Sequence, residues 1–173
     1  LPRAWTHAAP NLDVVIAEVD PMVTEVAQQE LWYAPSPNTF IYHRDARATL
    51  QGMDSKFDVI VGDAFHDLSV PQHLTTKEFA DEIHKKLNAN GIYLLNVIDF
   101  PHKPQFALSV VRTLEERFQH VALYANEDAK GQFSRPTFVI AASDRAKLPP
   151  LLRTQRATFE QWPQQYITYL EDI

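Results

Sequence analysis

Residues 57–71 of the chain read FDVIVGDAFHDLSVP, a short apolar run that meets a carboxylate and then passes into a polar loop. The carboxylate is Asp63, which directly follows the apolar residues. Three other apolar runs, within residues 14–20, 40–45 and 92–96, also end in an acid or an amide. In open parallel sheets the ligand lies just outside the carboxyl ends of the strands. The pattern therefore predicts a site for a hydroxyl-rich or cationic ligand.

Helical patterns separate these runs. Asp20 is placed to cap a helix over residues 21–29, and residues 76–87 and 104–118 carry apolar stripes of helical period. Gly91 is suited to end the second helix in the left-handed conformation. Further strands are predicted at residues 120–124 and 136–142. This order indicates an α/β fold with a mostly parallel, doubly wound sheet whose last strands form a reversed edge.

Composition narrows the classes of function. The 173 residues carry a net charge of −6, which makes nucleic acid an unfavourable partner and a cationic ligand a favourable one. The absence of cysteine excludes disulfides and thiolate chemistry, and it fits the reducing cytoplasm. No spacing of His and Asp supplies the three or four ligands of a metal site, so we expect no metal. No apolar run approaches the roughly 18 residues of a membrane span.

Glycine is scarce, and the Gly-rich turn that usually follows the first strand of a nucleotide-binding α/β domain is absent. We expect that the first strand and this turn are missing upstream of residue 1. We predict one domain over residues 1–146 and an amphipathic helical tail over residues 147–173, because the composition changes near Pro149 and Pro150.

Three acids are the leading candidates for the site. Glu18 can accept hydrogen bonds from both hydroxyls of a ribose. Asp45 can accept from the exocyclic amine of adenine. Asp63 can hold and deprotonate an amine nucleophile. The competing interpretations are a solvated loop acid for Glu18, a helix cap or a pair with a neighbouring arginine for Asp45, and the binding of loop amides for Asp63.

Asp67 follows Asp63 in the same loop. It offers a second anionic contact for a polyamine, although a solvated acid is the alternative.

Asn96 and Asp99 end the fourth predicted strand. We predict that they bind backbone groups near the cleft rather than take part in chemistry.

The loop motifs resemble the spermidine synthase (aminopropyltransferase) family, which has the class I methyltransferase-like Rossmann fold. The resemblance covers residues 1 to about 144. Its strongest part runs from residue 57 through Val70-Pro71, His73-Leu74-Thr75-Thr76 and Glu78-Phe79 to residue 91, with Glu18-Val19-Asp20 and Asp45-Ala46 upstream.

The resemblance implies a transferase that moves an aminopropyl group from decarboxylated S-adenosylmethionine to an amine such as putrescine, in polyamine biosynthesis. Glu18 would hold the ribose, Asp45 and Ala46 the adenine, and Asp63 the amine. The adenosyl donor would be a co-substrate rather than a tightly bound cofactor. A homodimer is the oligomer that the resemblance implies.

The chain departs from the family pattern in its loop. The family has a second acid three residues after the first, where this chain has His66. His66 and Asp67 are therefore the candidates for amine specificity. Two other functions stay open: a methyltransferase that uses S-adenosylmethionine on the same fold, and a non-catalytic fragment with an incomplete site.

Overall fold

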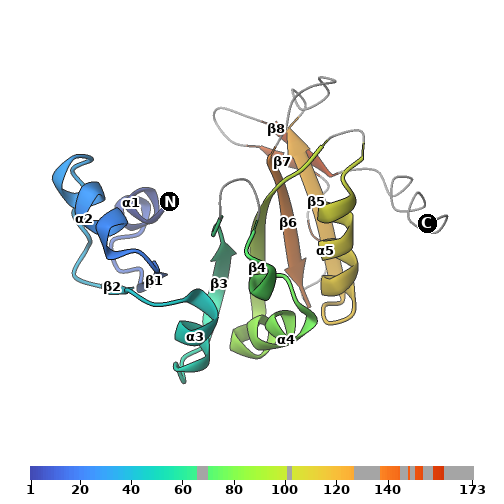
Figure 1. Ribbon diagram of the computed structural model, residues 1–173, viewed down its shortest axis with the longest axis horizontal. Coiled ribbons are helices and arrows are strands. Elements are labelled where there is room, and N and C mark those ends of the chain that lie inside the picture. The colour runs from blue at the N-terminus through green and yellow to red at the C-terminus, as the bar shows by residue number, and fades with distance from the viewer. Residues whose placement is uncertain are drawn as a thin grey trace. The chain divides into compact units, whose positions relative to one another are not determined.

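The computed structural model describes residues 1–65, 70–100, 103–126, 137–144, 148, 151–153 and 158–161. The chain divides into two compact units, residues 1–54 and residues 55–173 (Figure 1). Each unit is described by itself below.

The first unit is built on two parallel strands. Its elements in order are α1 (Pro2–Ala8), β1 (Val14–Ala17), α2 (Pro21–Gln29), β2 (Thr39–Tyr42) and α3 (Ala46–Gln51). Val14 pairs with Thr39 at one end of the two strands, and Ala17 pairs with Tyr42 at the other. Because β1 and β2 are parallel and end together, the residues that follow them leave from the same edge of this small sheet.

Side-chain caps begin the helices that follow these strands. The Asp20 Oδ1 atom accepts a hydrogen bond from the Met22 N–H at 2.9 Å, and Pro21 is the first residue of α2. This confirms the predicted cap, which satisfies one of the free N–H groups of the first helical turn. In the same way, Asp45 caps α3 through the Ala48 N–H at 2.9 Å.

The second unit contains a six-stranded sheet in the order β3-β4-β6-β5-β8-β7. Its strands are β3 (Phe57–Gly62), β4 (Leu87–Ile98), β5 (His120–Asn126), β6 (Thr137–Ser143), β7 (Leu151–Arg153) and β8 (Thr158–Gln161). Its helices are a short 3₁₀ helix (Gln72–Leu74), α4 (Lys77–Lys86) and α5 (Gln105–Glu115). β3 pairs with β4 in parallel, and the other pairs are antiparallel. The α/β fold and the reversed strands after the parallel ones are confirmed, and the reversed part is larger than predicted.

The added strands come from the segment that we predicted to be a helical tail. β8 occupies Thr158–Gln161 and pairs with β5, so the helix prediction is wrong for these four residues, and likewise for β7. The edge of β5 offers unpaired backbone groups, and an extended segment satisfies them where a helix would not. Residues 162–173 lie outside the described part of the chain, and the domain boundary at residue 146 stays a prediction.

The core of the second unit lies between the sheet and its two long helices. α5 packs against β5 and β6, and α4 packs against α5 and β4. The predicted apolar stripes face this core: Phe79, Ala80 and Ile83 are buried on α4, and Val110 and Leu114 on α5. Buried aromatic and aliphatic residues of the central strands, among them Tyr124, Phe138 and Ile140, complete it.

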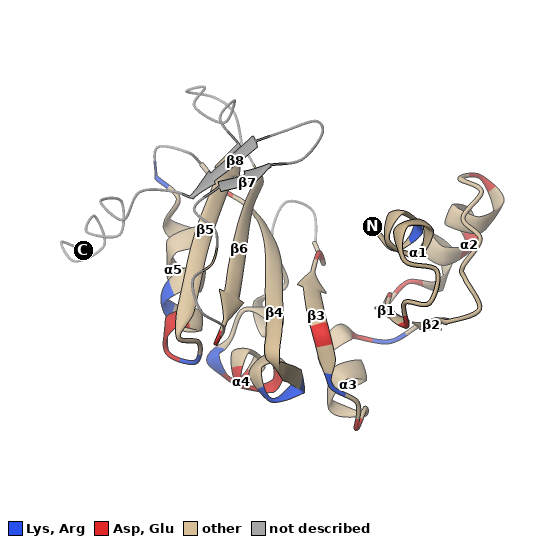
Figure 2. Ribbon diagram, turned by 180° about the vertical axis from the view of Figure 1, so that it is seen from behind, with Lys and Arg blue, Asp and Glu red and all other residues tan. Residues whose placement is uncertain are grey.

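Charged pairs join the outer surfaces of α4 and α5. Both acidic and basic residues lie along α4 (Figure 2). Lys77 pairs with Glu116, and Asp81 pairs with Arg117. Both ion pairs join α4 to the residues that directly follow α5. The Lys77 ammonium beside Glu116 holds the pKa of that carboxyl below its usual value. Exposed pairs of this kind contribute little to stability, so the apolar contacts dominate.

A third contact ties α4 to the ends of β5 and β6. The His84 Nε2 atom lies 2.7 Å from Asp144 Oδ2, and Asp144 Oδ1 accepts the Gln119 N–H at 3.0 Å. The ring of Phe118 packs edge-on against His84 with 5.1 Å between centroids. Partial burial raises the pKa of Asp144, but the hydrogen bonds from Gln119 and His84 outweigh it and leave that pKa below its usual value.

Gly91 differs from its predicted role. α4 ends at Lys86, because Leu87 is already extended and pairs with Phe57 at the start of β4. Gly91 lies within β4 and has no positive φ, so the left-handed cap is wrong. A Cβ atom on Gly91 would lie 2.9 Å from Leu87 Cδ2 and 3.0 Å from the Asn88 oxygen. Gly91 therefore allows a close approach of the backbone.

Gly62 is required where β3 meets β4. A Cβ atom there would lie 2.7 Å from Leu95 Cδ1 and 2.8 Å from the Tyr93 hydroxyl, and both side chains are buried. We expect Gly62→Ala to lower the free energy of unfolding by about 1–3 kcal/mol, because neither neighbour can move freely. Gly52→Ala is the matched control, since its nearest neighbour would be 3.5 Å away. Equal stability of the two variants in urea unfolding would contradict this packing.

The Asp144 contact predicts a pH dependence. A carboxyl whose pKa is lowered by folding contributes stability above its unfolded pKa of about 3.9, and this contribution is lost as the pH falls through the folded value. Asp144→Asn should therefore unfold at a lower temperature than the wild type at pH 7, and the difference should shrink below about pH 4. Thermal unfolding followed by circular dichroism at both pH values measures it. Asp13→Asn, at an exposed acid in the first unit, is the control variant.

Candidate functional site

Glu18 directly follows the carboxyl end of β1 in the first unit. Its backbone N–H donates to the Tyr42 oxygen at 3.0 Å, which extends the pairing of β1 and β2 by one bond. Its half-buried side chain turns back, so that Oε1 accepts the Asp20 N–H at 2.9 Å. This local bond orients the carboxylate and occupies one of its lone pairs. A carboxylate has about four such sites, so Glu18 can still accept from a ribose.

Asp45 follows β2 at the same edge. Its half-buried carboxylate caps α3, so the helix-cap interpretation describes what the structure contains. Capping uses Oδ1 toward Ala48. Capping and an adenine contact are compatible, because a carboxylate accepts several bonds. Ala46 is the first residue of α3. The ligand roles of Asp45 and Ala46 stay predictions.

Asp63 begins the loop after β3 in the second unit, and a neighbouring amide holds it. Gly62 pairs with Leu95 at the end of the parallel pair β3–β4, so the next residues, Asp63 and Asn96, leave side by side. The Asn96 Nδ2 atom donates to Asp63 Oδ1 at 2.7 Å. Asp63 is exposed, because β3 is the edge strand of its sheet.

Sequence reasoning missed this role of Asn96. We predicted that Asn96 and Asp99 bind backbone groups, and Asp99 does so through the Phe100 N–H at 2.8 Å and the Ala107 N–H at 3.0 Å. Asn96 instead binds a side chain on the adjacent strand. The signal in the sequence was its position: it ends the apolar run over residues 92–96, which follows the run that ends at Asp63.

The remaining predicted residues fall outside this geometry. His66 and Asp67 lie outside the residues that the structure describes, so their contacts with an amine stay predictions. Glu18 and Asp45 belong to the first unit and Asp63 to the second. Within the described ranges, no three His, Asp or Glu side chains gather as a metal site would require.

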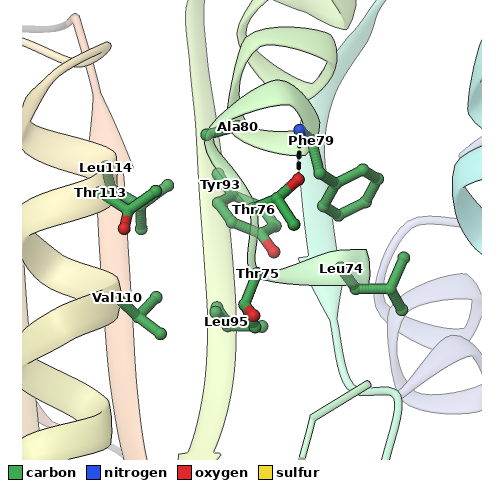
Figure 3. A pocket seen from close by; sticks show the side chains of 10 residues that line it. All are labelled: Leu74, Thr75, Thr76, Phe79, Ala80, Tyr93, Leu95, Val110, Thr113 and Leu114. Carbon is green, nitrogen blue, oxygen red and sulfur yellow. Dashed lines mark hydrogen bonds between the residues drawn. The ribbon is translucent and has the colours of Figure 1, made fainter. Parts of the chain in front are cut away.

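A small cavity lies inside the second unit, between α4, α5 and β4. Figure 3 shows the side chains that line it, including Leu74, Tyr93 and Val110. Its volume is about 10 Å³, which is about the space of one water molecule. Burial raises the pKa of the Tyr93 hydroxyl, so this group stays protonated. The cavity is a gap in the core and cannot hold a substrate.

None of the helices that the structure describes combines the length and the apolar character needed to cross a membrane.

Sequence comparison finds polyamine aminopropyltransferases among the relatives of the chain. The chain is 35% identical over 101 residues to the polyamine aminopropyltransferase of Vibrio vulnificus, a match that covers 56% of this chain and 33% of that protein. It is 26% identical over 88 residues to a probable polyamine aminopropyl transferase of Bifidobacterium longum, over 51% of this chain and 19% of that protein. The matches thus span a third or less of these relatives. No family model matches the chain.

Structural comparison gives the fold. A probable spermidine synthase from Corynebacterium glutamicum matches with a TM-score of 0.80 and 20% identity, over 98% of this chain and 64% of that one. A spermidine synthase in complex with the transition state analogue AdoDATO matches with a TM-score of 0.67 and 20% identity, over 79% and 48%. Human methyltransferase-like protein 13 in complex with SAH matches with a TM-score of 0.66 and 17% identity, over 98% and 75%.

These likenesses confirm the predicted fold class, a Rossmann-like fold shared by spermidine synthases and class I methyltransferases. The sequence matches relate the chain more specifically to polyamine aminopropyltransferases. Over the matched segment, the chain is homologous to polyamine aminopropyltransferases.

Proposed function

We propose that the protein transfers an aminopropyl group from decarboxylated S-adenosylmethionine to an amine such as putrescine, a step of polyamine biosynthesis. One observation carries the proposal: an exposed carboxylate, Asp63, is held by an amide at the carboxyl end of a parallel strand pair. The homology to polyamine aminopropyltransferases supports the same reaction.

The proposed chemistry is a direct displacement. The amine nitrogen attacks the aminopropyl carbon attached to the sulfonium, so a C–N bond forms as the C–S bond breaks. The electron pair of that bond stays on sulfur, which leaves as the neutral thioether of methylthioadenosine. The amine loses one proton, and Asp63 is the proposed acceptor. Such a reaction depends on positioning and deprotonation more than on covalent catalysis.

The first unit is the proposed donor site. Glu18 and Asp45 follow two paired parallel strands at one edge, where ligands of open α/β sheets bind. We assign the ribose to Glu18 and the adenine to Asp45 and Ala46. The neighbouring structures in complex with AdoDATO and SAH support an adenosyl ligand as co-substrate.

The amine site is the less constrained part of the proposal. His66 and Asp67 replace the spacing of acids that is usual in the family, so we assign to them the choice of amine. The net charge of −6 favours a cationic sulfonium and a cationic amine alike. A homodimer in the cytoplasm completes the proposal.

A methyltransferase that uses S-adenosylmethionine is the second candidate, because the likeness to human methyltransferase-like protein 13 extends over 98% of the chain. The two functions differ in the donor that the site prefers. Sequence homology favours the first.

Donor preference separates the two candidates. We expect decarboxylated S-adenosylmethionine and methylthioadenosine to raise the unfolding temperature of the protein more than S-adenosylmethionine does, since a ligand stabilises the folded state by about RT ln(1 + [L]/Kd). Differential scanning fluorimetry at equal ligand concentrations measures this order. A larger shift with S-adenosylmethionine would favour the methyltransferase instead.

Replacing Asp63 by asparagine tests its role in the reaction. Asp63→Asn keeps the shape of the side chain but removes the proton acceptor, so release of methylthioadenosine should fall about 100-fold or more while donor binding is retained. Asp58→Asn is the matched control, because Asp58 is an exposed acid at the other end of β3. Full turnover in Asp63→Asn would remove Asp63 from the reaction.

A further inference from the structure

We infer that Asn96 is a positioning residue for Asp63: its amide fixes the carboxylate at one oxygen and leaves the other oxygen directed to the amine. This inference rests on the proposed function and deepens it. Asn96 lies in β4, next to β3, and Asp63 directly follows β3.

The contact is a specific one. Asn96 Nδ2 lies 2.7 Å from Asp63 Oδ1, a short distance typical of a hydrogen bond to a charged acceptor. The amide must present its NH₂ group here, because its oxygen would repel the carboxylate. Within the described residues, no hydrogen bond or ion pair engages Asp63 Oδ2, so this oxygen is the one available to a substrate.

The two partners differ in how firmly they are held. Asn96 lies in β4, where it pairs with Val139 of β6 and stands between the buried residues Leu95 and Val97. Asp63 is exposed, follows the last paired residue of β3, and begins a loop. The firmly packed strand therefore orients the freer carboxylate. Without Asn96, Asp63 would sample several rotamers, and only some of them suit an in-line attack.

The chain contains a matched pair of the same chemistry. Asn88 Nδ2 donates to Asp58 Oδ1 at 2.8 Å, again from β4 to β3, and both acids are exposed. This second pair lies at the opposite ends of the same two strands, near Phe57 and Leu87. Removing it measures what such a bond contributes to the strand pair without touching the proposed amine site.

The experiment compares Asn96→Leu, Asn96→Gln and Asn88→Leu in the protein, with release of methylthioadenosine as the measured rate. We expect Asn96→Leu to lower kcat by about 10- to 100-fold with little change in KM for the donor, because a misplaced catalytic group costs rate rather than donor affinity. Asn96→Gln keeps an amide and should recover part of the rate. Asn88→Leu should keep the rate, and both Leu variants should show similar small shifts in unfolding temperature.

A second readout does not depend on turnover. In NMR spectra of the wild type, the side-chain amide protons of Asn96 should have chemical shifts that differ from those of an asparagine without a hydrogen bond. Asp63→Ala should move these shifts to the values of such an asparagine and should leave the shifts of Asn88 unchanged. An unchanged Asn96 signal in Asp63→Ala would overturn the pair.

The two proposals fail in different ways. Wild-type rates in Asn96→Leu, with an active wild type, would overturn the role of Asn96 and leave the aminopropyl transfer standing. A wild type that releases no methylthioadenosine with any amine would overturn the transfer itself, and the role of Asn96 with it.

Discussion

The parallel pairing of β3 with β4 is the contact on which the candidate site depends. It brings together two segments that are about thirty residues apart in the sequence and sets their register, with Gly62 opposite Leu95. Because both strands run the same way, their polar ends emerge at one edge, where Asn96 reaches Asp63. Gly62 is part of this constraint, since a larger residue would meet Tyr93 and Leu95. A shift of one residue would turn every side chain of β3 to the other face.

The first unit also contains a parallel strand pair with acids after its strands. β1 and β2 are parallel and end together, so Glu18 and Asp45 follow the strands at one edge. Both acids also serve the backbone: Glu18 accepts from Asp20, and Asp45 caps α3. These local bonds hold the carboxylates in place before any ligand arrives. Structural and proposed functional roles therefore coincide in the same side chains, which is common where a loop follows a strand and begins a helix.

The pattern of residues predicted local structure well and burial poorly. The cap at Asp20 and the stripes of α4 and α5 are decided within a few residues, and all are present. A short apolar run such as that of β3 is typical of a strand buried on both faces, yet Val59 is 47% exposed because β3 is an edge strand. The Gly91 cap and the helix over residues 158–161 were wrong for a related reason. In both places the backbone forms part of a strand that pairs with a neighbouring strand of the sheet.

The sequence by itself determined the alternation of strands and helices, the caps, the acids that end the strands, and the loop motifs that mark the homology. These features depend on neighbours along the chain. Tertiary structure decided that Asn96 binds Asp63, that Asp63 is exposed, and that Gly62 and Gly91 serve close packing. The physical reason is distance along the chain: hydrogen bonds and contacts between residues thirty or more positions apart arise only when strand order and register are set, and a local pattern carries neither.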